Sequence, residues 1–240
     1  MSNPPQALVI GAGSAIATSL IVSLLDKGYA VTAVSRKPAK QLSSKELTWH
    51  ETEYTDQAIA HICKTIASQD ISFSNIFICN GLLHTQEVMP EKQINQFSSE
   101  SFLTVLSANT LTPMLWISHL PKLLTKGIKT EVVIFSARVG SIGDNRLGGW
   151  YSYRASKAAL NMLVKTSAIE LKRRFKQAQF ILFHPGTTQS PLSKPFTQGS
   201  NNKTVFTPEF VATQLLSILE QGPQSDTCLY LDWQGKAIDW

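Results

Sequence analysis

Two residues capable of acid/base chemistry stand four apart in the second half of the chain. Tyr153 and Lys157 belong to the run Tyr-Arg-Ala-Ser-Lys, at the start of a segment with helical periodicity from about 153 to 175. On a helix they share one face, whereas Tyr151 is six residues from Lys157 and does not. A nearby ammonium favours the phenolate and lowers the pKa of a phenol from about 10. The pair predicts a tunable proton donor, although the same spacing also occurs on helices without a catalytic role.

A second candidate site is the glycine-containing turn near the N-terminus. Residues 11–17, Gly-Ala-Gly-Ser-Ala-Ile-Ala, lie between an apolar run at 7–10 and a helical pattern at 16–25. Backbone amides and the helix dipole at such a turn can hold a pyrophosphate, but a plain strand-to-helix turn is equally compatible with this partial glycine pattern. The candidate contacts are Gly11, Gly13, Ser14, Ala15 and Ile16.

The residues after the next apolar run indicate which dinucleotide this turn would take. An NAD site uses an acidic residue at this strand end for the ribose hydroxyls, and none is present here. The chain instead has Ser35, Arg36 and Lys37. A guanidinium can bind a 2′-phosphate bidentately and an ammonium adds a point charge, so the run favours NADP(H) over a solvated loop.

The elements that must position these residues alternate regularly along the chain. Apolar, strand-like runs lie near 7–10, 29–34, 47–54, 74–79, 131–136, 180–183 and 228–231. Helical patterns lie near 16–25, 56–67, 99–124 and 153–175, and a final helix is capped by Thr207 with Pro208 at its first position. Residues 35–45 read as a loop with some helix and 194–203 as a loop. The pattern predicts a doubly wound α/β fold, a parallel sheet with helices on both faces, in one domain spanning 1–240.

Several motifs occur together and in order. After the turn at 11–17 come Asn80-Gly81, Asn109, Ser136, the Tyr153 and Lys157 pair, and Pro185-Gly186. With these motifs the chain resembles the short-chain dehydrogenase/reductase family over nearly its whole length. Residues 79–84 and 136–157 are most similar to its carbonyl-reductase-like bacterial branch, which includes C-factor-type proteins. The resemblance implies a Rossmann fold and hydride transfer between NADP(H) and a small carbonyl or alcohol.

The resemblance also implies roles for the central residues. Tyr153 would protonate the carbonyl oxygen while Lys157 binds the nicotinamide ribose and lowers the tyrosine pKa. Asn109 would hold a relay water. Pro113 supports this independently, because it lacks the N–H that would bond the carbonyl of Asn109 and so disturbs the helix there, although a tolerated helix proline is equally compatible.

Further cofactor contacts follow from the same resemblance. Glu53 stands where the family often places an acid near the adenine, although an exposed carboxylate at a strand end explains it equally well. The other implied contacts are Asn80, Gly81, Pro185, Gly186, Thr188 and Ser190. Ala15 and Ala17 replace usual glycines, and their methyl groups would narrow the approach to the pyrophosphate without blocking it.

The chain departs from the family at its serine. That residue falls on Ala137, three before Gly140. We expect Ser136 to take over its role, with Ser141 as the alternative, or neither if the strand continues and turns Ser136 to the opposite face.

The composition narrows the class of protein. The 240 residues are 43% hydrophobic with a formal net charge of +5, and no apolar run spans a bilayer. Residues 1–6 lack a secretory signal, so we expect a soluble, cytoplasmic protein. Cys63, Cys79 and Cys228 have no metal-binding spacing and are expected to be reduced thiols, and no metal site is predicted. The basic run at 172–176 suits a helix C-terminus better than nucleic acid.

Partners and alternatives remain open in part. The helices near 99–124 and 153–175 are expected to pair in a homodimer or homotetramer, through Leu111, Met114, Leu115 and Ile117. The substrate is expected to meet the loop at 194–203 and a cavity mouth near His84. The physiological direction of the reaction is open, and a catalytically weak, NADP(H)-binding regulatory or signalling protein is the alternative function.

Overall fold

The computed structural model describes residues 3–39, 42–197, 204–222 and 226–240. Its strands are β1 (Gln6–Ile10), β2 (Ala30–Ser35), β3 (Leu47–Glu51), β4 (Asn75–Ile78), β5 (Thr130–Phe135), β6 (Ala178–His184) and β7 (Cys228–Asp232). Its helices are α1 (Ala15–Asp26), α2 (Asp56–Ala67), α3 (Ser99–Leu106), α4 (Thr112–His119), α5 (Tyr151–Lys172), α6 (Lys194–Thr197) and α7 (Pro208–Glu220). None of the helices in these ranges combines the length and apolarity that crossing a membrane requires.

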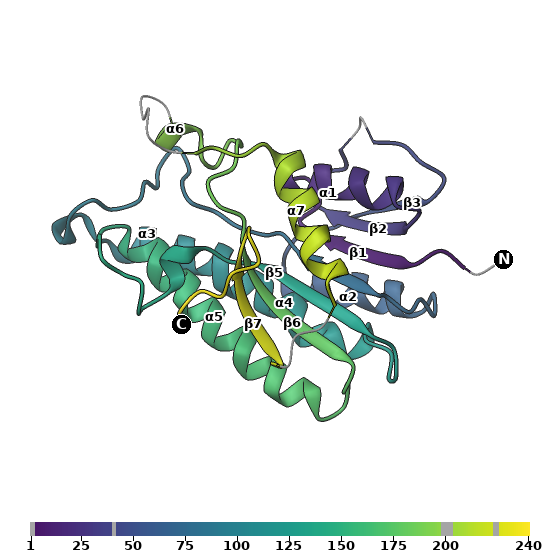
Figure 1. The fold of residues 1–240 in the computed structure, drawn as a ribbon. Helices are drawn as coiled ribbons and strands as arrows, with labels where there is room; N and C mark the ends of the chain where they lie inside the picture. Colours follow the sequence, from purple (N-terminus) through teal and green to yellow (C-terminus); the bar gives the residue numbers. More distant parts are fainter. Residues whose placement is uncertain (1–2, 40–41, 198–203, 223–225) are drawn as a thin grey trace.

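All seven strands pair in parallel, in the order β3-β2-β1-β4-β5-β6-β7 (Figure 1). The strand order reverses between β1 and β4. In open α/β sheets, ligands bind outside the carboxyl ends of the strands at this reversal. The predicted doubly wound parallel sheet is confirmed, and its switch point lies directly beside the turn at 11–14.

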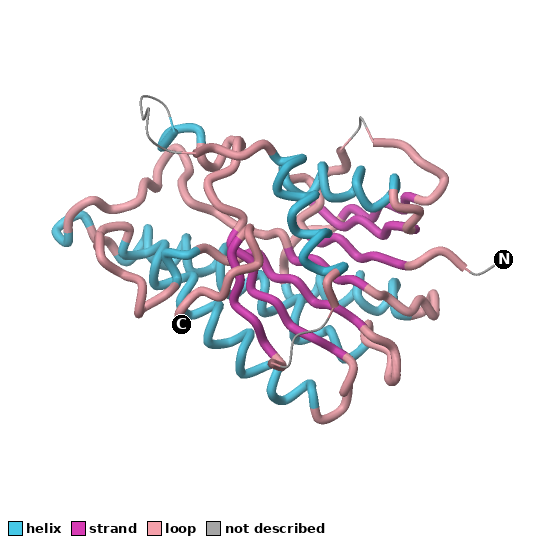
Figure 2. The backbone as a smooth tube through the Cα atoms, in the orientation of Figure 1, coloured by secondary structure: helices cyan, strands magenta, loops and turns pink. Residues whose placement is uncertain are grey.

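Helices cover both faces of the sheet, which therefore has two cores (Figure 2). Successive residues of a strand point to opposite faces, so Leu8 and Ile10 pack under α2, α4 and α5, while Ala7 and Val9 pack under α1 and α7. All four of these β1 side chains are fully buried. Burial on both faces explains why the strands read as nearly continuous apolar runs in the sequence.

Helix ends follow the sequence signals closely. The Thr55 and Thr207 hydroxyls accept the third N–H beyond them, from Ala58 and Phe210. Pro208 occupies the first position of α7, as predicted. These side-chain caps satisfy backbone donors that the first helical turn leaves free.

Three local predictions are wrong. The segment 99–124 is not one helix: α3 passes into a π-helical turn (Ser107–Leu111), then α4, then a 3₁₀ turn (Leu120–Lys122), because Pro113 cannot donate to the preceding turn. The described residues of 35–45 contain no helix. The predicted loop at 194–203 begins with α6, and residues 198–203 lie outside the described residues.

Candidate active site

Two adjacent cavities open at the carboxyl ends of the strands. The central cavity has a volume of about 460 Å³ and the lateral cavity about 630 Å³. Both are lined by Gly13, Ser14, Cys79, Asn80 and Gly81, so they form one groove across the β1–β4 switch point. Every predicted cofactor-binding residue lines at least one of the two cavities.

The turn at 11–14 is shaped by close packing. Gly11 has a φ of 76°, and a Cβ there would lie 3.0 Å from the carbonyl carbon of Cys79. Ser14 caps α1 by accepting the N–H of Ala17 at 3.3 Å. Of the two alanines that stand where the family usually has glycine, only Ala15 lines the cavity, because Ala17 is fully buried. The turn therefore aims the N-terminus of α1 at the groove.

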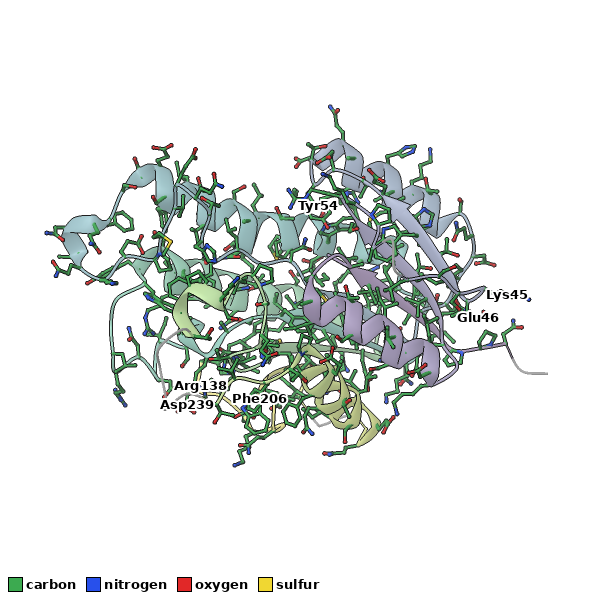
Figure 3. The ribbon with its side chains drawn as sticks, turned by 90° about the horizontal axis from the view of Figure 1, so that it is seen from above. Lys45, Glu46, Tyr54, Arg138, Phe206 and Asp239 are labelled. Carbon is green, nitrogen blue, oxygen red and sulfur yellow. The ribbon has the colours of Figure 1, made fainter. Side chains whose placement is uncertain are left out.

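Cationic side chains line the lateral cavity. Arg36 lies with its Cζ 5.5 Å from the ring centroid of Tyr54, and Lys37 and Glu53 line the same space. Within the described ranges, no carboxylate forms an ion pair with Arg36 or Lys37. The Ser35 hydroxyl donates to the Lys37 carbonyl. Figure 3 shows Tyr54 well separated from Arg138, a residue of the central cavity.

Tyr153 and Lys157 both line the central cavity, from the first turns of α5. Lys157 is buried, and its Nζ donates to the Phe135 carbonyl at 2.9 Å. Burial lowers the pKa of Lys157 to about 8. Burial raises the pKa of Tyr153 above its ordinary value, and Tyr230 adds to the effect. The predicted lowering of the tyrosine pKa by Lys157 is thus absent from this structure, where desolvation dominates.

The start of α5 is fixed from two sides. At Gly140, a Cβ would lie 2.8 Å from the Cβ of Lys157, so the loop packs directly against the helix. On the other side, the buried carboxylate of Glu91 accepts both the backbone N–H and the hydroxyl of Ser152. Sequence reasoning missed Glu91, because no local spacing connects it to a helix 60 residues later.

Asn109 lies in the π-helical turn and is fully buried. Its side chain donates to the Leu82 carbonyl at 2.8 Å and to the Ser156 hydroxyl at 3.1 Å, and accepts the Leu82 N–H at 2.6 Å. A Cβ on Gly81 would be 3.8 Å from both Asn109 Oδ1 and Lys157 Nζ. The break in α-helical bonding predicted at this position is confirmed, and π-turns of this kind are frequent at functional sites.

The two candidate serines make different contacts. The Ser136 hydroxyl donates to Asn161 Oδ1 at 2.6 Å, on the α5 side of the sheet, although Ser136 and Ala137 both line the central cavity. The Ser141 hydroxyl accepts the Asp144 N–H at 3.0 Å, and Ser141 is not among the described lining residues. Both hydroxyls thus already have partners within the protein.

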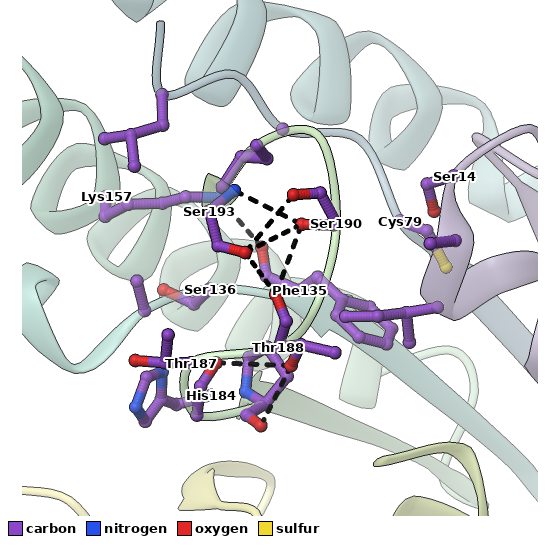
Figure 4. A pocket seen from close by; sticks show the side chains of 18 of the residues that line it. Ser14, Cys79, Phe135, Ser136, Lys157, His184, Thr187, Thr188, Ser190 and Ser193 are labelled. Atoms are coloured by element: carbon purple, nitrogen blue, oxygen red, sulfur yellow. Dashed lines mark hydrogen bonds between the residues drawn. The ribbon is translucent and has the colours of Figure 1, made fainter. Parts of the chain in front are cut away.

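The loop after β6 closes the other wall of the central cavity (Figure 4). Gly186 has a φ of 73°, and a Cβ there would lie 2.7 Å from the Phe206 ring. The hydroxyls of Thr188, Ser190 and Ser193 join in hydrogen bonds within this loop. Only glycine fits at 186, and its turn brings three hydroxyl groups to the groove.

Several lining residues carry no signal in the sequence. Apolar and aromatic side chains come from the three segments that follow β4, β5 and β6: Leu83, Val139, Trp150, Leu192 and Phe196. His84 is not among the described residues that line this cavity. Its ring Nε2 forms a hydrogen bond with the Pro191 carbonyl oxygen at 3.1 Å. His184 lines the cavity, its Nδ1 is buried without a partner in the described chain, and burial lowers its pKa to about 4. Only the folded loops bring these residues together.

The chain resembles known proteins over almost its full length. A family model described as short chain dehydrogenase matches residues 5–201. A 1-hydroxy-2-glutathionyl-2-methyl-3-butene dehydrogenase of Rhodococcus sp. (strain AD45) is 27% identical, covering 97% of this chain and 98% of its own. A benzil reductase of Bacillus subtilis (strain 168) is also 27% identical, covering 91% and 94%. An NADPH-bound carbonyl reductase from chicken fatty liver superposes with a TM-score of 0.83 at 21% identity, with both chains fully covered.

Proposed function

Because the chain belongs to the short-chain dehydrogenase family, we propose that it transfers a hydride between NADP(H) and a small carbonyl or alcohol. One observation carries the proposal: a single groove holds the turn before α1, the cations Arg36 and Lys37, and the Tyr153 and Lys157 pair. An anion site and a proton donor in one groove suit a phosphorylated dinucleotide bound beside a reacting carbonyl. We further propose that residues 1–240 form one domain and that the protein acts in the cytoplasm.

The donor set of the groove fits NADP(H). The N-terminus of α1 offers backbone N–H groups for the pyrophosphate, and Arg36 and Lys37 face the lateral cavity without carboxylate partners among the described residues. Asn80 Oδ1 is buried and lacks a partner there, which leaves an acceptor for a ligand hydroxyl. Glu53 would lie near the adenine, and Pro185, Gly186, Thr188 and Ser190 near the nicotinamide. When bound, the cofactor supplies the hydride.

The chain's own residues supply the proton. As hydride reaches the carbonyl carbon, Tyr153 gives its hydroxyl proton to the carbonyl oxygen, so an alcohol forms without a free alkoxide. The raised pKa of Tyr153 keeps the phenol protonated before reaction. Lys157 would hold the ribose, its ammonium would stabilise the resulting phenolate, and Asn109 fixes the segment beside it. We keep Ser136 as the first candidate for carbonyl orientation and Ser141 as the second.

Turnover with a carbonyl panel tests this function. We expect NADPH oxidation that depends on the added carbonyl, and Tyr153→Phe to lose at least about a hundredfold in kcat, the lower range for a general acid. NADPH binding to the variant should remain close to wild type, because the hydroxyl serves proton transfer. A loss below about tenfold would exclude Tyr153 as the acid.

A regulatory protein on the same fold is the second candidate function, favoured by Ala137 at the position of the family serine. It predicts that wild type binds NADPH but turns over no carbonyl. Ser136→Ala and Ser141→Ala separate the remaining cases. If both keep full activity, the enzyme works without that serine.

A further inference from the structure

The wall of the central cavity beside Tyr153 is aromatic. The Trp150 ring lies 6.1 Å from the Tyr153 ring at an interplanar angle of 73°, and the Phe196 ring lies 5.3 Å from Trp150 at 61°. Both rings line the cavity and are only half-buried by the protein itself. We call Trp150 and Phe196 the aromatic wall. Half-buried rings that line a cavity can pack a further ring edge-to-face or offset-stacked against them.

Trp150 is held in a conformation that bulky residues rarely adopt. Its φ of 54° and ψ of 43° lie in the left-handed region, after Gly148 and Gly149, which also have positive φ. The Trp150 N–H donates to the Glu91 carbonyl at 2.6 Å, which holds the turn. Residues held in this region at an energetic cost cluster at active sites and ligand clamps, which supports a role for the Trp150 ring in the cavity.

The same cavity leaves no basic side chain uncommitted for a charged substrate. Its described lining contains no carboxylate, and its basic residues are Arg138, Lys157 and His184. Arg138 pairs with Asp144 at 3.2 Å and with Asp232 at 2.9 Å. Lys157 donates to a backbone carbonyl and is assigned to the cofactor ribose by the proposed function, and burial lowers the pKa of His184 to about 4. A carboxylate or phosphate on the substrate would be desolvated here without a partner, which is costly.

We propose that the substrates are neutral carbonyl compounds with an aromatic ring attached to the carbonyl, and that Trp150 and Phe196 select this ring. The inference rests on the proposed function, since it assigns the substrate class of the same site. With the carbonyl oxygen at the Tyr153 hydroxyl, the adjoining ring lies against the aromatic wall. With the hydride that NADPH would supply at the carbonyl carbon and the tyrosine proton at the oxygen, the product is a benzylic alcohol.

Turnover of three aldehydes can separate the effect of an aromatic ring from the effect of a negative charge on the substrate. Benzaldehyde has the proposed features, cyclohexanecarboxaldehyde has similar size without a π-face, and 4-carboxybenzaldehyde adds a negative charge. We expect kcat/KM for benzaldehyde to exceed that for 4-carboxybenzaldehyde by at least about tenfold, because the charge finds no partner. The carboxylated aldehyde is not intrinsically less reactive. Equal values for these two substrates would overturn the proposal.

Variants of the wall test the residues themselves. We expect Trp150→Leu and Phe196→Leu each to lower the ratio of kcat/KM for benzaldehyde to that for cyclohexanecarboxaldehyde by about three- to tenfold. Trp150→Phe should largely keep the ratio. Phe97→Leu, an exposed phenylalanine outside the cavity, is the matched control and should leave it unchanged. An unchanged ratio in both leucine variants removes the wall as the selecting element.

The outcomes distinguish this inference from the proposed function. Reduction of the cyclohexyl aldehyde without reduction of benzaldehyde would leave the proposed function standing and overturn the inference. If no aldehyde is reduced, calorimetry of benzaldehyde with NADP⁺-saturated protein decides. Benzaldehyde binding that weakens in Phe196→Leu would support the aromatic wall while the proposed function fails. No binding would overturn both.

Discussion

Lys157 and Arg36 carry the same charge in very different surroundings. Lys157 is buried with one carbonyl partner, whereas Arg36 lines an open cavity beside Tyr54. The buried cation has a depressed pKa, and the cation in the cavity is available to a phosphate.

Arg36→Asp should erode or reverse a preference for NADPH over NADH. Loss of one bidentate phosphate contact costs on the order of 1 to 3 kcal/mol, and the new carboxylate repels a 2′-phosphate while accepting ribose hydroxyls. Dissociation constants for both cofactors, measured by fluorescence titration, check this. Lys45→Asp is the control for net charge, because Lys45 is exposed and outside both cavities. Equal wild-type affinities for the two cofactors would refute the assignment.

Lys157→Met should change how stability depends on pH. The pKa of Lys157 is about 8 in the fold against an ordinary 10.5. The unfolded chain therefore binds more protons between these values, and the free energy of unfolding contributed by Lys157 rises with pH across this window. Below pH 8 the full cost of burying the charge remains, up to about 3 kcal/mol.

We expect the methionine variant to be more stable than wild type at pH 7. The gain is smaller than the full cost of burying the charge, because the Phe135 carbonyl loses its hydrogen-bond donor. The advantage should shrink steadily toward pH 10. Urea unfolding at several pH values measures it. Lys176→Met, at an exposed lysine, should show no such trend. Parallel curves for wild type and Lys157→Met would contradict the assigned pKa.

Residues with fixed local spacing were predictable, and residues joined only by loops were not. Tyr153 and Lys157 follow from the four-residue helix repeat, and Arg36 from its place after a strand. Trp150 and Phe196 are 46 residues apart, and only the left-handed turn at 148–150 and the course of the loop after β6 bring their rings together. Sequence periodicity therefore could not predict this ring contact.

At the scale of elements, α5 depends on a segment far from it in the chain. Its N-cap residue, Trp150, makes no side-chain capping hydrogen bond. The Glu91 carboxylate caps the helix instead, by accepting hydrogen bonds from the backbone N–H and the hydroxyl of Ser152. A negative charge at a helix N-terminus is favourable. The loop before α3 thereby fixes the first turn of α5, which carries Tyr153.

Glu91→Ala should therefore lower the free energy of unfolding by about 1 to 3 kcal/mol, as expected for a lost cap that leaves buried donors unpaired. Glu91→Gln keeps an acceptor oxygen and should cost less. Urea denaturation measures both, and Glu87→Ala, at an exposed position of the same loop, is the control. An alanine variant as stable as wild type would show that water replaces the carboxylate.

The positions of the strands and the cap at Thr207 were predictable from the sequence because their signals are local. The limits of α2 and the cap at Thr207 agree with expectation. The π-turn at 107–111 could be predicted only as a disturbance, since Pro113 removes one donor but does not dictate which bonds form instead. Its geometry is set by buried contacts of Asn109 with Leu82 and Ser156.

At the scale of the whole molecule, the apolar surface expected on the helices is formed by Leu111 but not by the other three residues predicted for it. Of the four residues expected there, Ile117 is buried, and Met114 and Leu115 pack against the core. Only Leu111 is exposed. The sequence showed an apolar surplus but not how the π-turn rotates the residues after it.

The structure exposes an apolar face formed by α3, the π-helical turn and α5, which pack against one another. Leu103, Leu111, Met162 and Ile169 are each more than half exposed, at 60%, 52%, 65% and 54%. Met162 and Ile169 are seven residues apart and share one side of α5. An exposed apolar face of this kind is typical of a surface that a second subunit covers.

We therefore propose that this face pairs with its copy in a homodimer or homotetramer, and predict that Met162→Glu with Ile169→Glu yields monomers. Each introduced charge occurs twice in a self-complementary interface, so four like charges are buried together and repulsion adds to desolvation. Light scattering at micromolar concentration measures the mass. Leu147→Glu is the matched control, since Leu147 is 92% exposed on a loop outside this face. A wild type that is already monomeric, or a double variant with unchanged mass, would show that this face is not the interface.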